Sequence, residues 1–171
     1  MSGKQGSPET LRLLQTAIDL EEKGKAFFQQ AAATTRSEFA RRTFLFLAAE
    51  EDRHIERIKQ FYSDLEQLGE GQTPEVESSD AEDRLASFNE TLVKLKGEIH
   101  HSTSDTEAYR AALAFETGAE DFYADQARTA SDPQVRRFYE WLIAEEEMHE
   151  ALLRSCLEFA EDPVEWFRKH E

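Results

Sequence analysis

The sequence is poor in the residues that interrupt helices and in the residue that builds disulfide frameworks. Seven glycines and four prolines among 171 residues favour long helices over sheets and tight turns. A single cysteine, Cys156, excludes an internal disulfide framework and the paired Cys-x-x-C motifs of zinc and iron thiolate sites. We expect Cys156 to be a small core residue on the last long helix.

Positive charge is also scarce. Twenty basic residues face 36 acidic ones, which gives a formal net charge of −16 and repels both nucleic acid and anionic membrane surfaces while attracting cations. No stretch approaches the roughly 18 consecutive apolar residues of a membrane span. We therefore expect no nucleic acid and no membrane as partners, and a cytoplasmic location.

Apolar residues recur at spacings of three and four along most of the chain, which predicts an all-α protein. We expect a flexible N-terminus over residues 1–9 and one domain over residues 10–171. The pattern predicts a helical hairpin over about 10–68 and a second over about 104–160. A crossover over 69–103, with an extra helix from about 80 to 101, joins them, and a short helix follows at 163–170. The architecture expected is a four-helix bundle with a long crossover.

The most informative pattern is a set of acidic residues and histidines that occurs twice, displaced by 95 positions. Glu21, Glu51 and His54 in the first hairpin correspond to Glu116, Glu146 and His149 in the second. Apolar and aromatic positions keep the same displacement, as in Ala17 and Ala112, Phe44 and Tyr139, and Leu47 and Leu142.

A third Glu-x-x-His, ending at His101, lacks this support, because Leu68 stands where the partner Glu is needed. We therefore exclude it from the candidate site.

The repeated residues are expected to meet at one level of the bundle. Glu and His three positions apart project from the same face of a helix. The midpoint between Glu21 and Glu51 falls in the first predicted turn, and that between Glu116 and Glu146 falls in the second. Four carboxylates and two imidazoles would neutralise and hold two divalent metal ions. This donor set suits iron best, with manganese as the alternative.

Several segments resemble the rubrerythrin-like branch of the ferritin-like di-iron proteins. These are A-I-D-L-E-E-K-G-K-A-F-F and L-A-A-E-E-D-R-H in the first half, A-L-A-F-E-T-G-A-E-D-F-Y and L-I-A-E-E-E-M-H in the second, and D-P-V-E-W-F near the end. The resemblance implies the fold described above. It also implies that the six repeated residues are iron ligands, with Glu51 and Glu146 bridging the metals.

Two departures from the family pattern concern the site and its source of electrons. Rubrerythrins place an extra ligand Glu where this sequence has Ala119, and Glu120, one residue later, is a candidate for that role. Tyr123 is a core residue that could donate a hydrogen bond to a ligand. Rubrerythrins also carry a rubredoxin domain, for which a single cysteine is too few, so we expect an external electron-donor protein.

Other polar residues near the motifs are expected to be solvated. These are Glu22, Glu50, Glu145, Glu147, His100, His101 and His170.

Three functions fit the sequence. The first is a non-haem di-iron oxidoreductase that reduces hydrogen peroxide or oxygen with electrons from ferrous iron. The second is a ferroxidase that stores or detoxifies iron. The third is a non-catalytic helical module whose metals only brace the core, or which senses iron or oxygen for a partner. We expect a homodimer in each case.

Overall fold

The computed structural model describes residues 7–68, 72, 74–95 and 102–170, and within these residues the chain forms helices and no strand. The helices are α1 (Pro8–Thr34), α2 (Glu38–Gln67), α3 (Ala81–Val93), α4 (Thr103–Thr129), α5 (Pro133–Glu161) and α6 (Pro163–His170). The predicted all-α bundle is confirmed. Glu98, His100 and His101, which the sequence analysis excluded from the site, lie outside the described residues.

Side-chain caps fix where the long helices begin. Ser7 caps α1, Ser37 caps α2 and Ser102 caps α4, and each side-chain oxygen accepts a backbone N–H three residues later. The predicted flexible N-terminus is too long, because Pro8 and Glu9 already belong to α1. A cap at position 7 followed by proline at the first helical position is a strong start signal.

The crossover helix α3 ends earlier than predicted within the described residues, and the predicted segment 96–101 lies outside them. Helix α3 ends at Val93, and Leu95 N donates to Leu92 O at 3.0 Å, a bond that spans three residues. Such a tight turn replaces the four-residue bonding of an α-helix and ends it. The helix keeps its amphipathic character, with Ala81 and Leu92 buried.

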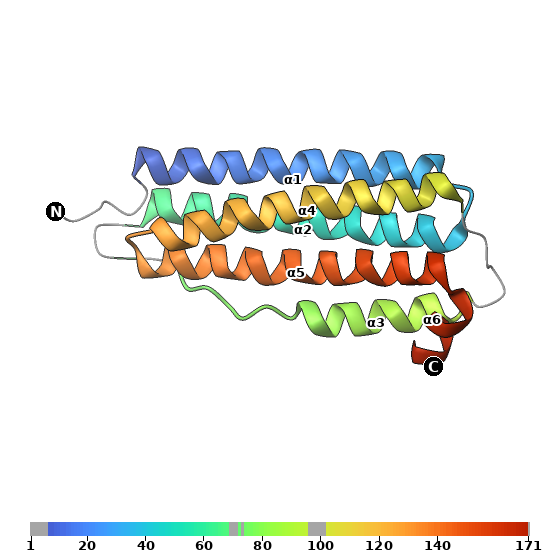
Figure 1. Cartoon of the computed structure of the whole chain (residues 1–171). Helices are drawn as coiled ribbons and strands as arrows, with labels where there is room; N and C mark the ends of the chain where they lie inside the picture. Colours follow the sequence, from blue (N-terminus) through green and yellow to red (C-terminus); the bar gives the residue numbers. More distant parts are fainter. Residues whose placement is uncertain (1–6, 69–71, 73, 96–101, 171) are drawn as a thin grey trace.

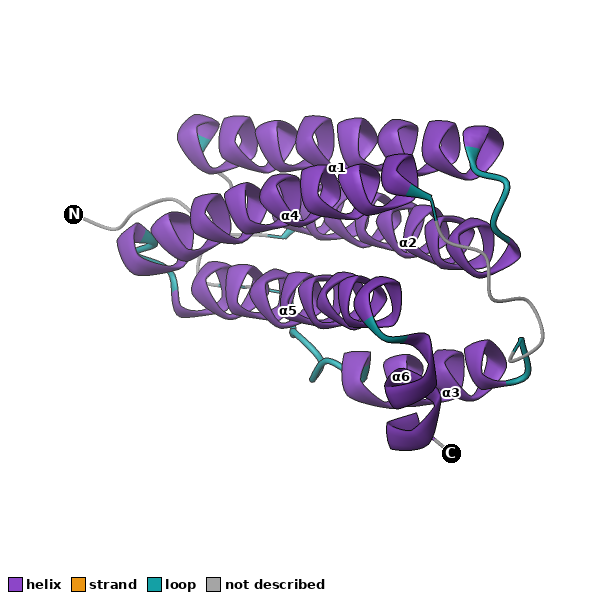
Figure 2. Ribbon diagram, turned by 45° about the vertical axis from the view of Figure 1, so that its right-hand side comes forward, coloured by secondary structure: helices purple, strands orange, loops and turns teal. Residues whose placement is uncertain are grey.

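The four long helices lie side by side along their length, with α1 packed against α2 and α4 against α5 (Figure 1). Helix α3 lies along the outer side of α5, and α6 turns back beside the end of α5 (Figure 2). On α6, Trp166 and Phe167 are buried, and Trp166 Nε1 donates to Ser155 Oγ at 2.6 Å. The short helix predicted at 163–170 is present and packs against α5.

The bundle has two hydrophobic clusters, one toward each end. One includes Phe28, Phe44 and Tyr109, with the buried Cys156, and the other includes Ile18, Ile55 and Phe138. Along each long helix, buried glutamate or histidine residues lie between the two clusters. A polar layer in the middle of the bundle is therefore closed at both ends by apolar side chains. Within the described residues, no helix combines the length and the apolar character that crossing a membrane requires.

Candidate metal centre

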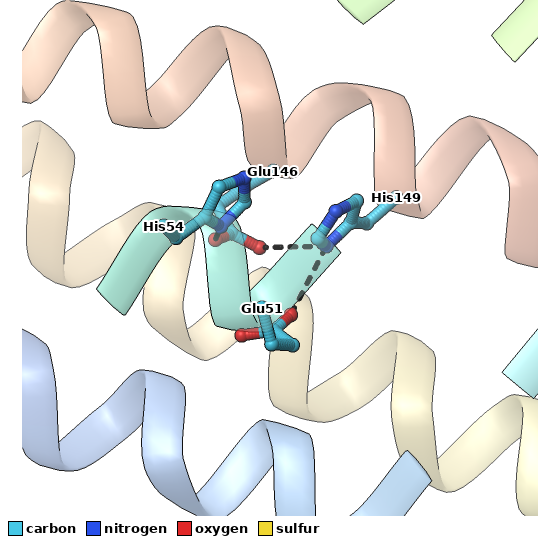
Figure 3. A group of neighbouring side chains, drawn as sticks. All are labelled: Glu51, His54, Glu146 and His149. Atoms are coloured by element: carbon cyan, nitrogen blue, oxygen red, sulfur yellow. Dashed lines mark ion pairs between the residues drawn. The ribbon is translucent and has the colours of Figure 1, made fainter. Parts of the chain in front are cut away.

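The six residues singled out by the 95-residue repeat meet in this middle layer. Each of the four long helices contributes, and none of the six residues is more than 1% exposed. They are Glu21 of α1, Glu51 and His54 of α2, Glu116 of α4, and Glu146 and His149 of α5. Four of them, Glu51, His54, Glu146 and His149, each place a ligand atom within 4.8 Å of the others (Figure 3).

The two imidazoles face the carboxylates through the same ring nitrogen. Nδ1 of His54 lies 2.9 Å from Glu21 Oε2 and 3.5 Å from Glu146 Oε1. Nδ1 of His149 lies 3.1 Å from Glu51 Oε1 and 3.6 Å from Glu146 Oε2 (Figure 3). The rings are stacked, with centroids 5.0 Å apart. Both Nδ1 atoms point to the same small volume between the helices.

Several buried polar atoms of this cluster make no hydrogen bond among the described residues, although some lie within ion-pair distance of one another. They are Glu51 Oε1, Glu116 Oε1, both oxygens of Glu146, and both ring nitrogens of His149. A buried unpaired polar atom is costly, so such a concentration indicates a missing partner. Divalent cations fit this need, because they accept lone pairs from carboxylate oxygens and imidazole nitrogens at once. The cluster can therefore hold metal.

The protonation of these groups shows how the cluster balances its charge without a cation. Burial raises the pKa of Glu51 well above its usual range, and the charge of Glu21 adds to the effect. Burial also raises the pKa of Glu116, to about 8, together with the charge of Glu146. Burial acts against the charged form of His149, yet Glu116 and Glu146 raise its pKa well above the usual value. In the metal-free site, protons on these side chains thus supply the positive charge that bound metal ions would otherwise supply.

Glu21 is held in its ionised form. Burial opposes this, but the charge of His54 prevails and lowers the pKa of Glu21 to about 2. Glu21 also accepts a hydrogen bond at Oε1 from the Tyr123 hydroxyl, which is fully buried. The hydrogen bond to a site carboxylate that the sequence suggested for Tyr123 is present. Burial raises the pKa of Tyr123 well above its usual value, so this hydroxyl remains a donor.

Glu120 pairs with a carboxyl that is not one of the six cluster residues. It is half-buried, and its pKa is raised to about 7, first by a hydrogen bond with Glu150 and then by burial. Ala119, the residue at the position of the family's extra Glu, is buried in one of the hydrophobic clusters. The structure thus places Glu120 beside another carboxyl on α5, and its role as a ligand stays a prediction.

Two residues expected to be solvated are buried instead. Glu50 is 4% exposed and Glu145 is 0% exposed, whereas Glu22 and Glu147 are exposed as predicted. His170 is only half-exposed and stacks on Trp166. The prediction was wrong for Glu50 and Glu145 because α3 covers them and supplies Arg84 as a counter-charge. Both keep the 95-residue displacement, but so do the exposed residues Asp52 and Glu147, so the repeat alone does not predict their burial.

Comparison with known families gives one match. The family model described as Rubrerythrin matches residues 12–161, a span that includes all six residues of the cluster. No significant match was found among curated proteins or among solved structures.

Proposed function

The chain belongs to the rubrerythrin family, and we propose that it is a di-iron oxidoreductase whose buried cluster reduces hydrogen peroxide or oxygen. The observation that carries the proposal is the concentration of unpartnered ligand atoms on six buried residues from four helices. Four carboxylates and two imidazoles match the donor set of ferritin-like di-iron and di-manganese centres. Iron is proposed first because imidazole and carboxylate donors suit it, and manganese remains the alternative.

The proposed roles follow the positions of the side chains. Glu21 and His54 would hold one ion, and Glu116 and His149 the other. Glu51 and Glu146 come from opposite hairpins and would bridge the two, since each lies close to a histidine of the other hairpin. Two ferrous ions held by these residues would supply one electron each, and two electrons with two protons would convert hydrogen peroxide to two waters.

The surrounding residues would orient the cluster and exclude bulk water. Tyr123 holds Glu21 through Oε1 and leaves Oε2 facing His54. The hydrophobic clusters above and below the polar layer limit access and strengthen electrostatic interactions inside it. After each turnover, electrons must come from a reductant outside the site, for which we propose an electron-donor protein. The homodimer and the cytoplasmic location stay predictions.

Anaerobic loading with ferrous iron followed by mixing with peroxide or oxygen tests this function. The loaded protein should consume peroxide or oxygen much faster than a Glu51→Ala variant, because that variant loses a bridging carboxylate. Equal rates in the two proteins would refute the proposal. Aerobic loading separates catalysis from storage, since retention of well over two irons per chain would identify an iron-storing protein.

A further inference from the structure

Arg84 of helix α3 places its guanidinium group between α2 and α5, next to the polar layer. Arg84 Nε donates to Glu50 Oε1 and Oε2 at 3.2 and 3.1 Å, and Nη2 donates to Glu50 Oε2 at 2.9 Å. Nη2 also donates to Glu145 Oε2. Glu50 and Glu145 are the residues immediately before the two proposed bridging carboxylates, and they correspond under the 95-residue repeat.

These two equivalent carboxylates have different neighbours. Glu145 Oε2 lies 3.2 Å from His54 Nε2, and Glu145 Oε1 accepts from Ser79 Oγ at 2.8 Å. Both carboxylates accept from Arg84, and Glu50 also accepts from Arg53 Nη1 at 3.0 Å. Nε2 of His149 has no hydrogen-bond partner among the described residues. The bond to a histidine that Glu145 makes in one half of the repeat is thus absent from the other half within the described chain.

We infer that Arg84, Ser79 and Glu145 form a positioning relay that fixes His54 and makes the two metal positions unequal. The inference rests on the proposed function, because it assigns Nδ1 of His54 to the metal. A histidine that binds metal through one nitrogen usually donates its other N–H to a carboxylate, which fixes the ring and strengthens the nitrogen as a ligand. Glu145 is in position to accept that N–H, while His149 has no equivalent acceptor in the described residues.

The relay also explains why a buried carboxylate is tolerated there. Glu145 is fully buried, and its charge would be costly without a compensating cation. Arg84, a residue of the crossover, supplies that charge at Glu145 Oε2. Ser79, just before α3, donates a hydrogen bond to the other oxygen, Glu145 Oε1. Glu50, His54 and Glu145 also lie close enough together to hold a metal ion. Arg84, however, donates to both carboxylates and already occupies this position with positive charge.

Titration with Co²⁺, which binds without redox chemistry, tests the relay through a matched pair of variants. Glu145→Ala and Glu50→Ala each remove one carboxylate from Arg84, but only the first removes the partner of His54. Glu145→Ala should weaken one of two binding steps about 10- to 100-fold and leave the other. Glu50→Ala should change both steps by a few-fold at most. In Glu145→Gln, the amide oxygen can still accept from His54. The loss of Co²⁺ affinity in this variant should lie between those of Glu145→Ala and Glu50→Ala, and the variant controls for misfolding.

A second measurement does not depend on affinity. In the Co²⁺-loaded protein, the proton on His54 Nε2 should exchange slowly with water by NMR, and Glu145→Ala should accelerate its exchange. The relay is refuted if wild type binds two ions but Glu145→Ala and Glu50→Ala behave alike. It is also refuted if the wild-type protein binds a third ion tightly, because the pair Glu50 and Glu145 would then be a metal site despite the presence of Arg84. Failure of the wild type to bind two ions would instead refute the proposed function.

Discussion

Tyr123 on α4 donates its hydroxyl hydrogen to Glu21 Oε1 on α1, although 102 residues separate the two in sequence. The contact crosses between the two hairpins at the level of the candidate metal centre. It places a neutral donor against a carboxylate whose other oxygen faces His54. The helix pair α1 and α4 is therefore joined by a polar contact at the site as well as by apolar packing.

Replacing this tyrosine tests the contact. Tyr123→Phe should lower the free energy of unfolding of the metal-free protein by ~1 to 3 kcal/mol, because a buried acceptor loses its donor. Tyr139→Phe is the matched control, since the Tyr139 hydroxyl is buried without a hydrogen-bond partner among the described residues. Urea denaturation should show Tyr139→Phe unchanged or more stable. Equal losses in both variants would contradict the assigned role of Tyr123.

Two helical glycines give a second test, because only one of them lies against the cluster. A Cβ at Gly24 would meet Glu51 Oε2 at 3.0 Å and Phe115 Cε1 at 3.1 Å. Gly24→Ala should therefore displace the Glu51 carboxylate and weaken metal binding, measured by Co²⁺ titration. A Cβ at Gly118 would meet nothing within 4 Å. Gly118→Ala should leave metal binding unchanged and stabilise the helix by ~1 kcal/mol. Unimpaired binding in Gly24→Ala would refute the close fit.

Metal binding should release protons and strengthen as pH rises. Without metal, Glu51 and Glu116 hold protons, and His54 and His149 each carry one more than the ligand form needs. Binding two ions near pH 7 should therefore displace about four protons. Calorimetry in buffers of different ionisation enthalpy counts them. Release of no protons would contradict the pKa assignments.

The same groups set the pH dependence of stability in the metal-free protein. Glu116 has a folded pKa of about 8 against an unfolded value of 4.5, so the folded state holds the extra proton between these values. Its contribution to stability is present below pH 4.5 and is lost as pH rises toward 8. The raised pKa values of the histidines act in the same direction above pH 6.5. The increase in melting temperature caused by metal should therefore grow from pH 6 to pH 8. A constant increase would contradict this assignment.

The sequence alone predicted the helical bundle and the six residues that meet in it. Long helices follow from regular apolar spacing, and the internal repeat separates Glu51 and His54 from the many other acidic residues. Burial of Glu50 and Glu145 was missed, because their counter-charge is Arg84, a residue of the crossover that no local pattern links to them. The first turn of α1 was missed because capping by Ser7 outweighed the polar character of the segment.

The central claim, a buried site for two iron ions, is tested most directly by anaerobic ferrous iron loading followed by removal of free metal. Iron per chain would be measured in the wild type and in Glu51→Ala, with Glu22→Ala as a control at an exposed acidic position. The account predicts two irons per chain in the wild type and in Glu22→Ala, and a loss of iron in Glu51→Ala. Fewer than two irons in the wild type, or the same content in Glu51→Ala, would contradict it.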